Sequence, residues 1–178
     1  GLLILSLLTL KNISKRTKNK FKKHLTKEEK LKYIDMLTSL KNRNYLNDNI
    51  NVWDESEIYP QAVIVVDLND ISYINDNYGH AEGDEVIKEA ANILIKNQLP
   101  NTEIIRTNGN EFLVYLVGYD ERQVVAHLKK LNKELRDLKH GYGSASGHSM
   151  ILDGIKTIDD AINEATIEMR NNKEEATK

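Results

Sequence analysis

The apolar residues of this chain follow two patterns: short continuous or alternating runs, and longer stretches at helical spacing. Residues 61–68 form a continuous, mostly apolar run, which predicts a strand buried on both faces. Alternating residues on both sides of Asn108-Gly109 predict a β-hairpin over 102–107 and 110–117 with a type I′ turn. A further strand is expected over 144–152.

Helical patterns separate these strands. Apolar residues recur at helical spacing over 84–98 and 121–138. Asn69 is the predicted N-cap of a short helix that continues to Asn77 and is stopped by Gly79. Further helices are expected over 42–53 and 158–170, and a charged linker helix over 21–36. The order of elements predicts an α+β fold, with a mostly antiparallel sheet in a ferredoxin-like arrangement flanked by helices.

Length and composition indicate a single domain without thiol chemistry. A chain of 178 residues with 40% hydrophobic residues can bury one sizeable core. It has no cysteine, which excludes disulfides and thiolate metal sites.

The charge is unevenly distributed along the chain. Residues 1–24 hold seven of the 25 basic residues and none of the 27 acids, so the rest carries 18 basic and 27 acidic residues, a net charge of −9. A part this acidic is a poor candidate for nucleic-acid binding, and we expect no nucleic acid as a partner.

The apolar residues 1–10 lead directly into this basic segment. Ten residues cannot span a bilayer, but an apolar stretch followed by Lys and Arg matches the cytoplasmic end of a membrane helix. We interpret 1–10 as the end of a transmembrane helix whose beginning is missing, and 11–34 as a basic juxtamembrane segment and linker helix. The alternative is a soluble amphipathic leader.

Candidate chemistry lies where the apolar strand ends. The carboxylate of Asp67 would project from the carboxyl edge of the sheet, where Mg²⁺ can be held by one or two carboxylates together with substrate phosphates. Glu111 lies on the predicted hairpin, but Asn110 beside it is an amide where such chemistry favours an acid. Residues 69–84 hold several Asn and Asp side chains, and an Asn and an Asp can together read guanine, although ordinary capping also explains this segment.

Four segments together give the chain a family resemblance. They are residues 35–43 (DMLTSLKNR), the strand ending in Asp67, residues 75–84 (NDNYGHAEGD) and residues 108–112 (NGNEF). In order and spacing they resemble the GGDEF domain of diguanylate cyclases, which would then occupy residues 35–178. The resemblance implies a fold like that of nucleotide cyclases and the polymerase palm. It also implies a homodimer that makes cyclic di-GMP from two GTP with Mg²⁺ or Mn²⁺.

The resemblance also assigns roles to individual residues. Asp67 and the backbone carbonyl of Leu68 would bind metal, and Asp67 and Glu111 would be the catalytic acids. The nucleotide-binding residues implied are Asn75, Asp84, His80, Arg106, Gly109 and Lys173.

Departures from the family pattern decide which function we expect. Asn110 replaces the acid that bridges the metals, and an amide brings no negative charge to balance two divalent ions and cannot act as a general base. Asn69 replaces a second usual acid, and Ser72 stands where a phosphate-binding lysine is usual. We therefore expect a degenerate GGDEF domain at the cytoplasmic face of a bacterial membrane that binds GTP, with one ion rather than two and weak or no cyclase activity. The alternatives are an active diguanylate cyclase and a dimerisation or docking module without nucleotide.

Overall fold

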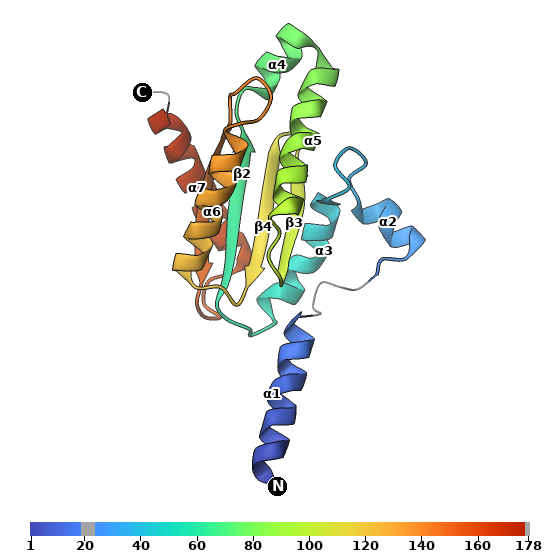
Figure 1. The fold of residues 1–178 in the computed structure, drawn as a ribbon, viewed down its shortest axis with the longest axis vertical. Coiled ribbons are helices and arrows are strands. Elements are labelled where there is room, and N and C mark those ends of the chain that lie inside the picture. Colours follow the sequence, from blue (N-terminus) through green and yellow to red (C-terminus); the bar gives the residue numbers. More distant parts are fainter. Residues whose placement is uncertain (19–23, 177–178) are drawn as a thin grey trace.

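The computed structural model describes residues 1–18 and 24–176. The helices are α1 (Leu2–Lys18), α2 (Lys27–Tyr33), α3 (Arg43–Asp54), α4 (Ile71–Tyr78), α5 (His80–Lys96), α6 (Glu121–Leu135) and α7 (Ile158–Ala176). The strands are β1 (Lys41–Asn42), β2 (Gln61–Leu68), β3 (Thr102–Asn108), β4 (Glu111–Val117) and β5 (Ser144–Ile151). The α+β fold class predicted from the sequence is confirmed (Figure 1).

The five strands form one sheet in the order β1-β3-β4-β2-β5. Strand β2 lies between β4 and β5 and is antiparallel to both, while the two-residue β1 is parallel to β3. Strands and helices from β2 to β5 follow the ferredoxin-like order, β2-α5-β3-β4-α6-β5, with α4 inserted before α5. This order places the end of β2 beside the turn between β3 and β4.

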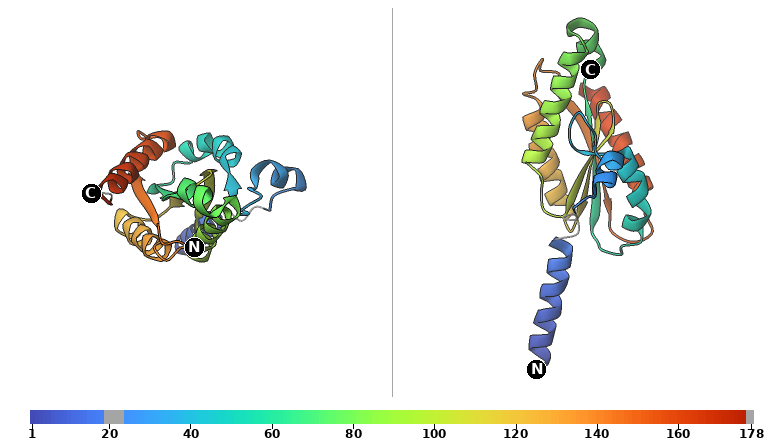
Figure 2. Two further views of the ribbon diagram at one scale, coloured as in Figure 1. Left: turned by 90° about the horizontal axis from the view of Figure 1, so that it is seen from above. Right: turned by 90° about the vertical axis from the view of Figure 1, so that its right-hand side faces the viewer.

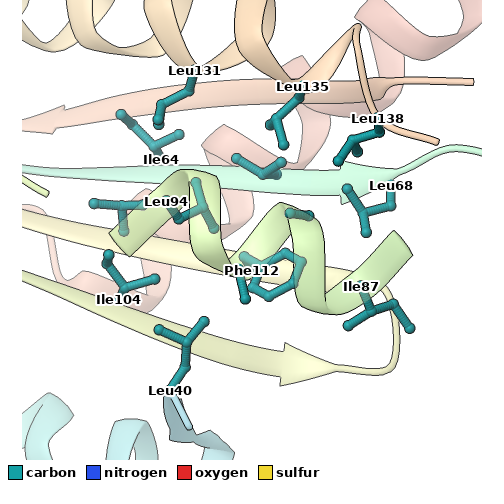
Figure 3. Close-up of a cluster of buried hydrophobic side chains, with 14 of the residues drawn as sticks. Leu40, Ile64, Leu68, Ile87, Leu94, Ile104, Phe112, Leu131, Leu135 and Leu138 are labelled. Carbon is teal, nitrogen blue, oxygen red and sulfur yellow. The ribbon is translucent and has the colours of Figure 1, made fainter. Parts of the chain in front are cut away.

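Helices cover both faces of the sheet (Figure 2). On one face, Ile64 and Leu68 of β2 pack with residues of α5 and α6, including Leu94 and Leu131 (Figure 3). The alternate residues of β2, Val63 and Val65, pack on the other side with residues of α3 and α7. Trp53 of α3 belongs to this second cluster. Strand β2 is therefore buried on both faces, as its continuous apolar run predicts.

The predicted type I′ turn at Asn108-Gly109 is wrong. Strand β3 continues to Asn108, which pairs with Glu111, so Gly109 and Asn110 form the turn. Neither turn residue has the positive φ that type I′ requires. A register shift at Thr107 bulges the strand instead, and side-chain hydrogen bonds hold the turn: Arg106 donates to the Gly109 carbonyl at 2.8 Å and 3.2 Å.

Asn69 does not cap α4, contrary to prediction. The N-cap position belongs to Asp70, which has a φ of 59° and makes no capping hydrogen bond through its side chain. The Asn69 amide instead donates to the Tyr142 carbonyl at 3.0 Å, a contact between segments distant in the sequence. A tertiary hydrogen bond has here replaced local capping.

Several predicted helices have different bounds. Helix α6 ends at Leu135 rather than residue 138, and α7 continues to Ala176 rather than residue 170. The long helix α5 starts at His80 rather than residue 84, because Gly79, with a φ of 94°, ends α4 and is followed directly by α5. The linker helix over 21–36 is reduced to α2, capped by Thr26, and Ile34 is already extended and bridges to Lys41. Residues 21–23 of that prediction lie outside the described residues.

Helix α1 contains the apolar residues predicted to belong to a membrane helix, and these are exposed, with Leu2 at 91%. Within residues 1–18 and 24–176, no helix combines the length and hydrophobicity needed to cross a bilayer. The membrane assignment of residues 1–10 stays a prediction.

Strand β5 lies at one end of the sheet, and side chains occupy its outer edge. Asn172 donates to the Ser146 carbonyl at 2.8 Å, and the His148 N–H donates to the Glu168 carboxylate at 3.1 Å. Lys156 donates to the Met150 carbonyl at 3.0 Å. Three backbone groups that could pair with another strand are therefore already bonded.

Removing these side chains is expected to expose the edge. In a Lys156→Ala, Glu168→Ala, Asn172→Ala variant, the freed backbone groups can pair with a second chain, so we expect self-association above that of the parent. Light scattering of both proteins in the same mild detergent measures this, with Asn171→Ala, Glu175→Ala as the control on exposed positions of α7. Equal scattering by all three proteins would contradict a protective role for these side chains.

Candidate functional site

The candidate site centres on Asp67 near the end of β2. The antiparallel register sets Asp67 opposite Glu111 of β4 and Ala145 of β5. Its side chain is only 17% exposed, so its carboxylate needs partners within the protein. This edge of the sheet lies next to α4, at the top of the molecule in Figure 1.

Both carboxylate oxygens of Asp67 are engaged. The Asn110 amide nitrogen donates to Oδ1 at 2.7 Å, and the Lys173 ammonium donates to Oδ2 at 2.9 Å. The same amide lies 3.3 Å from the Leu68 carbonyl oxygen. Since a carboxylate and a carbonyl can only accept, the amide nitrogen must be the atom that faces them. Four residues predicted for the site, Asp67, Leu68, Asn110 and Lys173, are thus brought together.

These residues do not suit a pair of divalent metal ions. The cluster has one carboxylate, and its partners are an amide and an ammonium group, which offer no charge to balance a second ion. Among the described residues, no three His, Cys, Asp or Glu side chains are grouped closely enough to hold a metal. A single ion fits only if the Asn110 amide turns to present its oxygen and Lys173 moves away.

Glu111 is bonded within the hairpin rather than to Asp67. Its carboxylate accepts from the Thr107 hydroxyl at 2.6 Å and from the Asn108 amide at 3.3 Å. It also lines a cavity of about 280 Å³ between α3 and α7, together with Arg43. The two predicted catalytic acids are thus neighbours in the register of β2 and β4 but have different hydrogen-bond partners: Asp67 bonds to Asn110 and Lys173, and Glu111 to its own hairpin.

Arg106 links the hairpin to the segment that follows α2 by hydrogen bonds. Beyond its bonds to Gly109, its guanidinium contacts both carboxylate oxygens of Asp35, at 3.0 Å and 3.1 Å. Burial disfavours the charge on Asp35, but hydrogen bonds from Thr38 and Arg106 outweigh it, so the pKa of Asp35 lies below its usual value. This contribution to stability is present above the unfolded pKa of Asp35 and is lost as pH falls through the lower, folded pKa. The predicted roles of Arg106 and Gly109 in nucleotide binding stay predictions.

The predicted guanine-reading residues lie on α4 and α5. Asn75 packs so closely on Gly83 that a Cβ added there would lie 1.8 Å from the Asn75 Oδ1. That Oδ1 is buried and has no hydrogen-bond partner. Asp84, the residue after Gly83, is exposed, as is His80 at the start of α5. The exposed carboxylate of Asp84 leaves hydrogen-bonding capacity for a ligand, and the Asn75 oxygen would add to it once its side chain turns outward.

Two supporting features of this site were not predicted from the sequence. Gly83 makes room for Asn75, and Asp35 fixes Arg106. Close glycine packing leaves no signal in a single sequence. The Asp35–Arg106 pair joins residues 71 positions apart, and hydrophobic patterning does not report such contacts.

Comparison with known proteins identifies the family. The model of the family described as "Diguanylate cyclase, GGDEF domain" matches residues 32–178. The chain belongs to the GGDEF family. A probable diguanylate cyclase of Escherichia coli K12, DgcT, is 32% identical over 105 residues, which are 58% of this chain and 23% of DgcT. An uncharacterized membrane protein of Staphylococcus aureus USA300 is 32% identical over 99 residues, 55% of this chain and 28% of that protein.

The fold agrees with solved GGDEF structures. The coiled coil and GGDEF domain of DgcB from Caulobacter crescentus, in complex with c-di-GMP, has a TM-score of 0.76 at 18% identity, covering 98% of this chain and 96% of that one. A sensory box/GGDEF family protein from Caulobacter crescentus CB15 has a TM-score of 0.66 at 29% identity, covering 80% and 99%. The chain spans about a quarter of the length of the curated relatives described above.

Proposed function

We propose that this GGDEF domain binds GTP or a related guanine nucleotide and has weak or no cyclase activity. The observation that carries the proposal is the 2.7 Å hydrogen bond from the Asn110 amide to Asp67. It puts a neutral donor where the family resemblance implies a second metal-binding acid. On the guanine side, the exposed carboxylate of Asp84 and the amide of Asn75, whose oxygen has no partner in the protein, would contact the base.

The roles of the residues follow from their chemistry. Asp84 would accept the two adjacent N–H groups of guanine, and Asn75 would accept a further one through its unpaired oxygen. Lys173 would meet phosphate oxygens, since its side chain is 41% exposed beside Asp67. A bound Mg²⁺ or Mn²⁺ would polarise phosphate oxygens, and Asp67, the Leu68 carbonyl and a rotated Asn110 would hold one such ion.

The proposal places the domain in a homodimeric signalling protein at the cytoplasmic face of a bacterial membrane. Support comes from the apolar residues 1–10, the basic residues that follow them, and the naming of the S. aureus relative as a membrane protein. The basic stretch would lie against anionic lipid headgroups on that side.

Calorimetric titration of the full chain with GTP, with ATP as the comparison, tests nucleotide binding. We expect GTP to bind and ATP to bind at least about tenfold more weakly, since adenine lacks the adjacent N1–H and N2–H donors of guanine that Asp84 would accept. In Gly83→Ala the new Cβ would displace Asn75, so GTP affinity should fall about tenfold while stability changes by less than about 1 kcal/mol. No GTP binding would favour the docking module instead.

A product assay tests the loss of cyclase activity. The protein is incubated with GTP and Mg²⁺ or Mn²⁺, and cyclic di-GMP is sought by chromatography, for the parent chain and for Asn110→Asp. We expect little or no product from the parent and more from the variant, because aspartate restores the missing charge. Robust product from the parent would overturn the proposal in favour of an active cyclase.

A further inference from the structure

The position of Lys173 beside Asp67 is set by the packing of α7. One turn earlier, Met169 is buried against the sheet, and Asn172 is bonded to the Ser146 carbonyl at 2.8 Å. Gly147 of β5 allows the backbone of α7 to approach closely, since a Cβ there would lie 2.1 Å from the Ala165 carbonyl oxygen. Lys173 therefore extends from an anchored helix turn, with its ammonium 2.9 Å from Asp67.

We propose that the ammonium of Lys173 takes the place of a divalent ion at Asp67, so that this domain binds the phosphates of a guanine nucleotide without needing Mg²⁺. This inference rests on the guanine-nucleotide binding of the proposed function and puts the Lys173 ammonium in place of its single metal ion. An Mg²⁺ ion sits about 2.1 Å from its carboxylate oxygens, and an ammonium at hydrogen-bond distance occupies the same space. A divalent ion would have to displace Lys173 in order to bind Oδ2, or the Asn110 amide in order to bind Oδ1.

The hydrogen-bonding capacity of Lys173 fits this role. An ammonium has three N–H donors, and one of them is used on Asp67. With its side chain 41% exposed, the remaining donors can reach phosphate oxygens from solvent. Asp67 and Lys173 together are neutral, so the attraction for phosphate comes from directed N–H donors and not from excess positive charge.

Titration of the nucleotide-free full chain with MnCl₂, followed by electron paramagnetic resonance, tests the inference directly. The parent is expected to bind no Mn²⁺ at millimolar concentrations, whereas Lys173→Met, which frees one oxygen of Asp67, should bind it at least about tenfold more tightly. Lys133→Met, an exposed position on α6, is the matched control and should behave as the parent. Equal Mn²⁺ affinity of the parent and Lys173→Met would overturn the inference.

A second titration uses GTP in EDTA and in excess Mg²⁺. The affinity of the parent for GTP should agree within about threefold between the two buffers. The affinity of Lys173→Met for GTP should be about tenfold lower than that of the parent in EDTA, and part of this loss should be recovered in Mg²⁺. Binding of GTP by the parent only in Mg²⁺ would overturn the inference and leave the proposed function intact. Failure to bind GTP in either buffer would count against the proposed function, and the Mn²⁺ titration would still decide the role of Lys173.

Discussion

The Asn110→Asp variant is expected to be about 2 kcal/mol less stable than the parent in EDTA and to regain stability with Mg²⁺ or Mn²⁺. The substitution removes the 2.7 Å hydrogen bond to Asp67 and sets a second carboxylate in its place. A partly buried carboxylate that loses its donor and gains a like charge is destabilised, and Lys173 can offset only part of this. The loss corresponds to a fall in Tm on the order of 6 °C.

Metal should reverse this effect because two carboxylates and the Leu68 carbonyl together suit a divalent ion. At a hundredfold excess over its Kd, a ligand stabilises the folded state by about 2.7 kcal/mol. Thermal unfolding followed by circular dichroism, with and without Mg²⁺, measures both steps. Asn171→Asp repeats the chemical change at an exposed position of α7 and should shift stability by less than about 0.5 kcal/mol. A variant as stable as the parent in EDTA would show that Asn110 and Asp67 do not interact as described.

Gly147→Ala is expected to destabilise the fold by about 3 kcal/mol or more. The added methyl would lie 2.1 Å from the Ala165 carbonyl oxygen and 2.6 Å from the Met169 backbone nitrogen. Because both are backbone atoms of α7, the clash can be removed only if the whole helix moves away from β5. The expected cost is therefore larger than that of overpacking flexible side chains in a core. Urea unfolding monitored by circular dichroism gives the change in free energy.

Gly109→Ala is the matched control for this change. An added Cβ at Gly109 meets nothing within 4 Å, and the residue does not have a positive φ. The expected change in stability is below about 1 kcal/mol. Similar losses in both variants would mean that the cost arises from removing glycine and not from the contact between α7 and β5.

The sequence predicted the bounds of β2 and β3–β4 closely. An apolar run is a direct indication of a buried strand, and an Asn-Gly pair is a direct indication that the chain reverses. The turn type was missed because Arg106 and Thr107, not the turn residues, shape the hairpin. The cap of α4 was missed because Asn69 bonds to Tyr142, 73 positions away. In both cases hydrogen bonds of side chains outweighed a local preference.

The composition of the site could be predicted only in part. Strand alternation and the family resemblance pointed to Asp67, Asn110 and Lys173, but not to the two bonds that join them. Lys173 is 106 positions from Asp67, and only the packing of α7 on β5 brings its ammonium to the carboxylate. The neutral state of the cluster is thus a property of the folded chain that no single segment reveals.

The C-terminal part of α7 has two structural roles within about one and a half helical turns. Glu168 and Asn172 occupy the outer edge of β5, and Lys173 satisfies Asp67. Unwinding these last turns would therefore expose a strand edge and leave a carboxylate without its cation in the same event. The two costs add, so local fraying at this end should be rarer than at an ordinary helix terminus. A domain joined after residue 178 that pulls on α7 would act on the site and on self-association together.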